Sequence, residues 1–114
     1  MSVHLHYATV YVSDQDRSLE FYTKVLGFEK RRDDPMGPDQ RWIEVAQPGE
    51  STTVLLYTPS EAMPGASTLA EARARIGGFS GVGLRADDIR ALFSTLRAHG
   101  AKILEEPSQQ PWGW

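Results

Sequence analysis

The chain has 114 residues, which is enough for one domain with a hydrophobic core and too few for two. A formal net charge of −3 offers no basic surface for nucleic acid. The lack of cysteine excludes disulfides, thiolate metal sites and cysteine nucleophiles. The sequence has neither a signal-peptide pattern nor an apolar stretch of about 20 residues, so we expect a cytoplasmic protein without a membrane partner.

The first half of the chain predicts one helix between strands. Residues 7–12 are β-branched and aromatic, which is typical of a strand. Asp14 then offers a helix N-cap, and Gly27 a stop. The apolar residues between them recur at helical spacing and are Leu19, Tyr22, Val25 and Leu26. Further strands are predicted over 28–32, 42–46 and 52–57, with a turn at 33–39 and a hairpin connection at 47–50.

The second half begins with a long mixed segment, 58–78, whose centre at 68–76 predicts a short helix. A connection of this length is typical of a functional lid or of a disordered excursion. Residues 82–86 alternate as in a strand, and Asp87-Asp88 offers a helix cap. The helical stripe that follows consists of Ile89, Leu92, Phe93 and Leu96. Gly100 predicts the end of this helix, and 102–105 predict a strand.

The two halves share one pattern. The interval from Asp14 to Gly27 equals the interval from Asp87 to Gly100, which is 13 positions. Each interval joins a predicted strand to a capped helix, a glycine and another strand. This coincidence predicts an internal duplication of a β-α-β unit.

The stretch from Val10 to Phe28 resembles the opening of glyoxalase and bleomycin-resistance proteins of the vicinal-oxygen-chelate superfamily, which includes extradiol dioxygenases. The likeness rests on Val12-x-Asp14-x-x-x-Ser18-x-x-Phe21-Tyr22-x-x-x-Leu26-Gly27-Phe28, and on Val82-Gly-Leu-Arg-Ala-Asp87 before a helix ending at His99-Gly100. The resemblance implies an α+β fold of paired βαβββ modules whose curved sheets enclose a small-molecule cavity. Two domains or two chains commonly pair around such cavities.

The resemblance divides the single domain 1–114 into module one at 1–58, the long loop 58–78 and module two at 79–114. Members of the family usually end with two further strands, whereas this sequence stops at Pro111-Trp-Gly-Trp114. We therefore expect an incomplete second module and an open sheet edge, which a partner chain or a ligand would cover. Together with exposed tryptophans, this edge predicts a homodimer.

The resemblance also implies a divalent metal held by histidines and glutamates. The three ligand positions within this sequence fall at Tyr7, near Leu55 and near Gly81, and none carries an imidazole or a carboxylate. His6 is adjacent, but one step along a strand reverses the face of the side chain. We interpret His4 and His6 as an exposed strand start, and His99 as a C-terminal helix residue. We expect no metal and no other cofactor.

Strand alternation assigns an aromatic face to the sheet, opposite the helices. The predicted ligand-binding residues are Tyr7, Tyr11, Trp42, Glu44, Leu55, Tyr57, Arg85 and Trp112. Apolar walls with one acid and one base suit a ligand pocket. The alternatives are a second small core or a dimer surface, with Glu44 and Arg85 simply paired. Glu44 is also the sole candidate for acid-base chemistry, and no catalytic residue is assigned.

Three functions remain open from the sequence. The favoured one is a metal-free small-molecule-binding protein, similar to the bleomycin-resistance branch that sequesters drugs. The second is a metal-dependent lyase, isomerase or dioxygenase of the glyoxalase or dioxygenase type, with ligands that are unrecognised or lie beyond Trp114. The third is a regulatory module whose concave face binds protein, because fold alone does not choose among them.

Overall fold

The structure is a computed structural model that describes residues 2–38, 40–61, 68–104, 107–108 and 111. The chain divides into two compact units, Met1–Val82 and Gly83–Trp114. Within the described ranges, the first unit contains a sheet and its helices, and the second contains one helix. The division of a single domain into modules at 1–58 and 79–114 stays a prediction.

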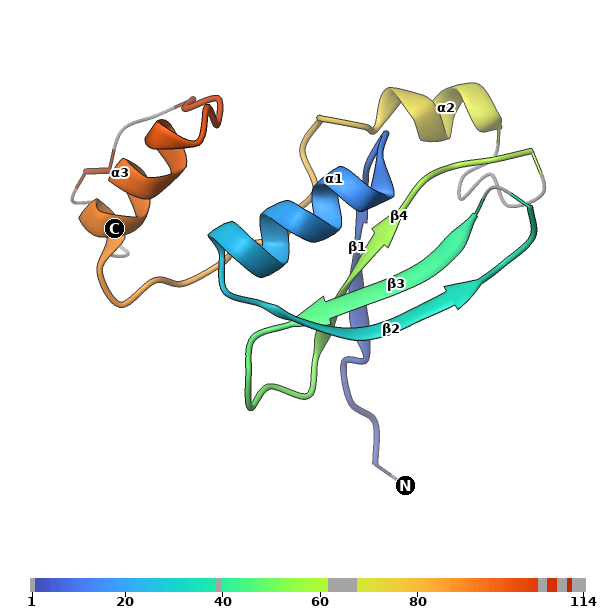
Figure 1. Cartoon of the computed structure of the whole chain (residues 1–114), viewed down its shortest axis with the longest axis horizontal. Helices are drawn as coiled ribbons and strands as arrows, with labels where there is room; N and C mark the ends of the chain where they lie inside the picture. Colours follow the sequence, from blue (N-terminus) through green and yellow to red (C-terminus); the bar gives the residue numbers. More distant parts are fainter. Residues whose placement is uncertain (1, 39, 62–67, 105–106, 109–110, 112–114) are drawn as a thin grey trace. The chain divides into compact units, whose positions relative to one another are not determined.

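The first unit is built on a four-stranded mixed sheet of β1 (Tyr7–Tyr11), β2 (Glu29–Pro35), β3 (Arg41–Ala46) and β4 (Thr53–Tyr57). The strand order is β1-β4-β3-β2 (Figure 1). β1 runs parallel to β4, and the other neighbours are antiparallel. The predicted α+β class is confirmed, and the strands predicted at 7–12, 42–46 and 52–57 are present to within one residue.

β2 extends beyond its predicted end. A turn was expected from Asp33 onward, but the strand continues to Pro35, where it pairs with Arg41 of β3. Pro35 is tolerated because β2 is an edge strand and a proline at its end removes no hydrogen bond from an inner ladder. The register shifts between Lys30 and Arg32, where an extra residue bulges out of the ladder.

The first helix begins where the sequence predicts. The Asp14 side chain accepts a hydrogen bond from the Arg17 backbone N–H at 3.1 Å, and α1 follows over Gln15–Glu20. The helix then widens into the π-helical turn η1 (Phe21–Val25), where the Leu26 N–H bonds to the Phe21 carbonyl. Gly27 has a φ of +76°, as its predicted place after the helix requires.

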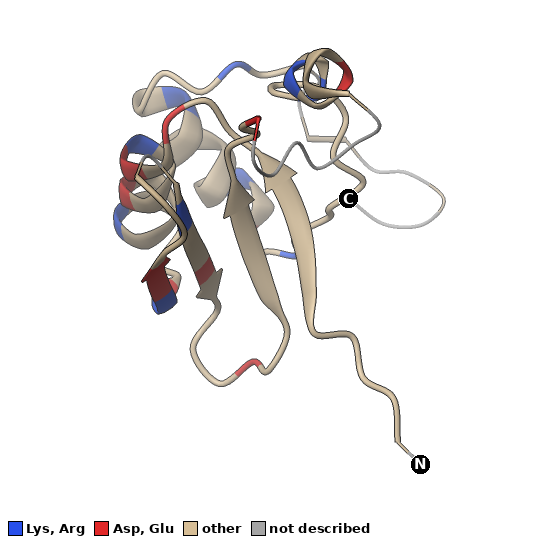
Figure 2. Cartoon of the chain, turned by 90° about the vertical axis from the view of Figure 1, so that its right-hand side faces the viewer, with Lys and Arg blue, Asp and Glu red and all other residues tan. Residues whose placement is uncertain are grey.

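The core lies between α1–η1 and one face of the sheet. Its buried members are Val12, Ile43, Val45, Val54 and Leu56, against which Val10, Leu19, Tyr22 and Phe28 pack. The members from β1, β3 and β4 lie on the side opposite the aromatic face that alternation predicted, so both faces of these strands agree with the prediction. Figure 2 shows that β1 and β4 carry no charged residue, whereas charges gather on α1 and β2.

Helix α2 (Leu69–Ala74) forms in the predicted place within the long connection and belongs to the first unit. The second unit contains α3 (Ile89–Ala98), whose N-cap is Asp88. The Asp88 side chain accepts a hydrogen bond from the Ala91 N–H at 3.0 Å. Across the ranges that the structure describes, no helix is long and apolar enough to cross a membrane.

The strands predicted for the second module are absent from the structure at 82–86 and at 102–104, and Glu105 lies outside the described residues. An isolated extended segment leaves its backbone groups unpaired, so it becomes a strand only beside a neighbour. These segments pair with no other strand among the described residues. The prediction of paired βαβββ modules is therefore met only by the first module.

Candidate functional site

The sheet face opposite α1 carries aromatic side chains in two pairs. The rings of Tyr7 and Trp42 lie 5.5 Å apart at 87°, and those of Tyr11 and Tyr57 lie 5.5 Å apart at 85°. Such edge-to-face geometry is the favoured arrangement of aromatic quadrupoles. We call this surface the aromatic face and define it as Tyr7, Tyr11, Trp42, Leu55 and Tyr57, with Glu44 between the two pairs.

Glu44 is a buried carboxylate in the middle of this face, and only 1% of the residue is exposed. Its Oε1 accepts a hydrogen bond from the Thr53 hydroxyl at 2.7 Å, and its Oε2 accepts one from Trp42 Nε1 at 2.6 Å. The Arg32 guanidinium lies 3.6 Å from Oε2. A buried charge is tolerated when it is paired and hydrogen-bonded in this way.

These surroundings keep Glu44 ionised. Burial is the largest single influence and raises the pKa of its carboxyl, whereas the hydrogen bonds from Thr53 and Trp42 lower that pKa. The nearby charges of His6 and Arg32 lower it further, so the net pKa lies below its usual value. A general base works best with a pKa near the operating pH, so this arrangement disfavours Glu44 in that role.

The structure brings six of the eight predicted site residues onto one surface. Tyr7, Tyr11 and Trp42 are partly accessible, whereas Leu55 and Tyr57 of the inner strand β4 are buried. Arg85 belongs to the second unit, and Trp112 lies outside the described residues. Whether any of the eight binds a ligand stays a prediction. The ionic partner that the structure gives Glu44 is Arg32.

Sequence reasoning missed four residues that contact this surface. Thr53 shares the face of Leu55 and Tyr57 by the alternation of β4, and its hydroxyl bonds to Glu44. Arg32 lies opposite Glu44 because the register of β2 shifts between Lys30 and Arg32. His6 is exposed just before β1, as predicted, and its ring also lies 5.3 Å from that of Tyr7. Arg75 of the long connection lies over Tyr11. Only Thr53 had a usable signal, the period of two along β4.

The positions at which the family places its metal do not fit a metal ion here. Tyr7 and Leu55 supply one phenol and one aliphatic side chain, and Gly81 supplies no side chain. Among the described residues, no group of three or more histidine, aspartate and glutamate side chains is placed to hold one. Most metal sites in enzymes use at least three such side-chain donors.

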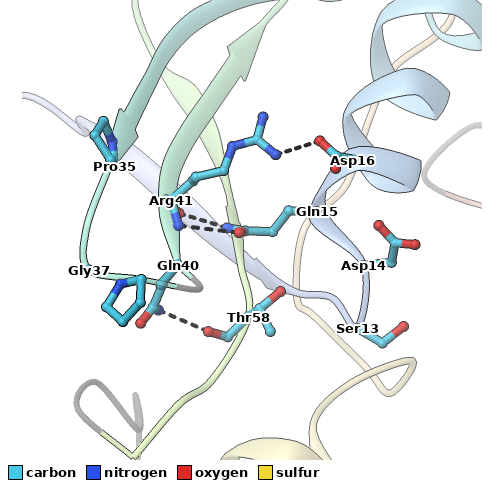
Figure 3. Close-up of a pocket in the computed structure, with 10 residues that line it drawn as sticks. Ser13, Asp14, Gln15, Asp16, Pro35, Gly37, Gln40, Arg41 and Thr58 are labelled. Carbon is cyan, nitrogen blue, oxygen red and sulfur yellow. Dashed lines mark hydrogen bonds and ion pairs between the residues drawn. The ribbon is translucent and has the colours of Figure 1, made fainter.

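A hollow of about 580 Å³ lies at the end of the sheet, lined by other residues than those of the aromatic face (Figure 3). It is lined by the start of α1, the β2–β3 turn and the end of β4. The lining residues are Ser13, Asp14, Gln15, Asp16, Pro35, Gly37, Pro38, Gln40, Arg41 and Thr58. None of the predicted site residues is among them.

The polar groups of this hollow bind one another. Arg41 donates to Asp33 at 2.7 Å and also to Asp16, and the hydrogen bond from Arg41 lowers the pKa of Asp33. The Gln15 amide donates to the Arg41 carbonyl at 2.7 Å and to the Leu56 carbonyl at 2.9 Å. Gln15 thus bridges β3 and β4 at the end of their ladder. We interpret the hollow as structural, because its strong donors and acceptors are already matched.

Known proteins are similar to this chain in both sequence and fold. The Glyoxalase/Bleomycin resistance protein/Dioxygenase superfamily model matches residues 4–113. The uncharacterized protein YetH of Bacillus subtilis (strain 168) is 32% identical over 104 residues, which are 91% of this chain and 78% of YetH. The chain therefore belongs to the glyoxalase, bleomycin-resistance and dioxygenase superfamily, as the resemblance in its first half implied.

Two solved structures are similar along nearly the whole chain. A member of the same superfamily from Sphaerobacter thermophilus DSM 20745 has a TM-score of 0.79 and 36% identity, covering 98% of this chain and 83% of that one. TnmS3, an antibiotic binding protein from Streptomyces sp. CB03234, has a TM-score of 0.73 and 31% identity, covering 98% and 82%.

Proposed function

We propose that this protein binds a small aromatic molecule on the aromatic face without the help of a metal. The observation that carries the proposal is the pair of edge-to-face contacts, Tyr7 with Trp42 and Tyr11 with Tyr57, on one side of the sheet. Aromatic side chains around a few fixed polar groups are typical of ligand sites. The similarity to an antibiotic binding protein favours a binding function.

The state of Glu44 supports binding rather than catalysis. Its carboxylate is held on both oxygens and its pKa is lowered, so it is a poor proton acceptor at neutral pH. The hydrogen bond from Trp42 to Glu44 also fixes the orientation of the Trp42 ring, because the indole N–H has only one direction in which to donate. A ring fixed in advance loses little conformational entropy when a ligand stacks on it.

Calorimetric titration with 2-naphthoate and with its uncharged analogue 2-naphthamide tests this function. We expect binding of at least one of the two, and a loss of about tenfold in affinity for Tyr7→Ala, or about 1.4 kcal/mol. Phe79→Ala is the matched control, because Phe79 is fully exposed and outside the aromatic face. No binding of either compound, or equal losses in the two variants, would contradict the proposal.

The metal-dependent alternative has its own result in the same titration. Binding to a metal-free face is unaffected by EDTA. If EDTA abolishes binding and Zn, Ni, Mn or Fe(II) restores it, the enzyme of the glyoxalase or dioxygenase type becomes the better interpretation. The third possibility is that the aromatic face binds protein. It is indicated if macromolecular partners bind there and small molecules do not.

We also propose that the protein is a homodimer. Among the described residues, β1 pairs only with β4 and so presents a free edge, and partly exposed Tyr7 lies on that strand. Free strand edges favour pairing with another chain. Light scattering at micromolar concentration checks this, and a strictly monomeric mass would contradict it.

A further inference from the structure

A guanidinium lies over one end of the aromatic face. The Arg75 Cζ is 5.5 Å from the centre of the Tyr11 ring, and its Nη1 donates to the Tyr11 hydroxyl at 3.5 Å. Tyr11 in turn meets the edge of Tyr57. Arg75 follows α2, which Figure 1 places at the same end of the sheet as the end of β1. A segment of the long connection therefore reaches the candidate site.

The local structure of α2 explains why Arg75 is held there. Thr68 caps the helix by accepting a hydrogen bond from the Glu71 N–H at 3.1 Å. Ala72 is fully buried, so this side of α2 packs closely. Arg75 is three residues further on and thus on the same side of the helix. Gly77, with a φ of +74°, then turns the chain away.

In the part of the chain that the structure describes, no carboxylate pairs with the Arg75 guanidinium. Three other arginines of the first unit each form an ion pair, and they are Arg31, Arg32 and Arg41. Arg75 forms none among the described residues, and the two contacts of its guanidinium there are with Tyr11. A guanidinium over a ring keeps its in-plane N–H donors directed outward, which suits a carboxylate or another anionic oxygen group.

The acid on this surface lies two strands away from β1. Glu44 of β3 pairs with Leu55 of β4, and Leu55 pairs with Thr9 of β1. Two strand spacings amount to about 10 Å at roughly 4.8 Å each. The charge of Glu44 is also offset by the Arg32 guanidinium, 3.6 Å away. An anion beside Arg75 is thus little repelled by Glu44.

We propose that Arg75 determines ligand specificity on the aromatic face, by selecting flat aromatic molecules that carry an anionic oxygen substituent. The ring of such a ligand contacts Tyr11 and its neighbours, and the substituent accepts hydrogen bonds from the guanidinium. This inference rests on the proposed function, since it names the chemical class that the same surface binds.

The test compares 2-naphthoate with 2-naphthamide by calorimetry, since the two share a ring and differ in charge. We expect wild-type protein to bind 2-naphthoate about tenfold more tightly than 2-naphthamide, as for one charge-assisted pair. We call this factor the affinity ratio of the two compounds. Arg75→Gln should bring the affinity ratio close to one by weakening the binding of 2-naphthoate alone. Arg75→Lys should keep part of the preference for 2-naphthoate. Arg73→Gln is the matched control on the same helix and leaves the ratio unchanged.

The outcomes separate the two proposals. If 2-naphthamide and 2-naphthoate bind equally to wild type, or if Arg75→Gln keeps the ratio, the role of Arg75 is wrong and the binding function stands. If Arg73→Gln lowers the ratio as much as Arg75→Gln does, the preference is a general effect of surface charge and the role of Arg75 is again wrong. If neither compound binds, both proposals fail.

Discussion

The two units of this protein start from the same local pattern and reach different structures. In each, an aspartate caps an amphipathic helix that ends before a glycine with positive φ, Gly27 in one and Gly100 in the other. The first helix covers a four-stranded sheet with a buried core. In the second unit none of the described residues is buried, and no strand accompanies α3.

The comparison separates local from non-local interactions. A capped helix satisfies its own backbone hydrogen bonds and needs only its own residues. A strand satisfies its hydrogen bonds through neighbours that are distant in the sequence. The first unit supplies those neighbours, since β1 pairs with β4 some 46 positions later, from Tyr7 to Thr53. The described part of the second unit does not.

Hydrogen exchange should give the largest contrast between the units. We expect the β4 amides, such as those of Val54 and Leu56, to exchange only through global unfolding of the first unit. Amides of 82–86 should exchange almost freely, because they are in no ladder. Mass spectrometry of peptic fragments measures both. Equal protection of the two segments would mean that 82–86 has a strand partner in solution.

Core truncation should be nearly as large. Leu56→Ala removes a side chain with 0% exposure and should lower the free energy of unfolding by about 2–5 kcal/mol. Leu104→Ala makes the same chemical change at 86% exposure, and its effect should stay within about 0.5 kcal/mol. Urea denaturation measures both. A large effect at Leu104 would reveal packing in the second unit.

Glu44→Gln should cost about 1–3 kcal/mol at pH 7, because charge-assisted hydrogen bonds from Thr53 and Trp42 are weakened. The pKa of Glu44 is lower in the folded state than the unfolded value of about 4.3. The unfolded chain therefore takes up this proton first as the pH falls. The stabilisation is present above about pH 4.3 and is lost as the pH falls through the folded pKa.

Denaturation of wild type and Glu44→Gln at several pH values between 3 and 7 checks the sign. The difference in unfolding free energy between wild type and Glu44→Gln should become smaller as the pH is lowered. A gap that widens toward acid would mean that the folded pKa of Glu44 is raised. The second unit has no buried carboxylate among its described residues, so no comparable effect is expected there.

Removal of the helix caps should change stability the least, and each change should be confined to the unit that contains the cap. Asp14→Ala should lower the free energy of unfolding of the sheet unit by about 1 kcal/mol, because α1 packs on the sheet. Asp88→Ala removes the same kind of hydrogen bond. It should speed hydrogen exchange within α3 and leave β4 unchanged. Equal effects on β4 would show that the two units unfold together.

Much of the first unit was predictable from the sequence because it depends on local chemistry. Alternation along 7–12, 42–46 and 52–57 assigned both faces of the sheet correctly, since successive side chains of a strand point to opposite sides. The same rule placed Thr53 and Glu44 on one face without indicating their hydrogen bond. That bond depends on the register between β3 and β4, which pairs Glu44 with Leu55.

The contacts that complete the candidate site were not predictable from local pattern. Arg32 reaches Glu44 because of a bulge in β2, and the turn residues around Asp33 gave no signal of a strand there. Arg75 reaches Tyr11 from a segment 64 positions later in the chain. No periodicity within a short window reports a contact over such a distance.

The sequence by itself determined the helix caps, the apolar stripes of the helices and the alternating faces of the first sheet, because each depends on residues a few positions apart. Only the tertiary structure decided which predicted strands exist, where Glu44 finds its hydrogen bonds and which arginine lies over the aromatic face. The physical reason is the range of the interactions. Capping and alternation are satisfied within one turn or one strand, whereas ladders, buried charges and ring contacts require partners brought together by folding.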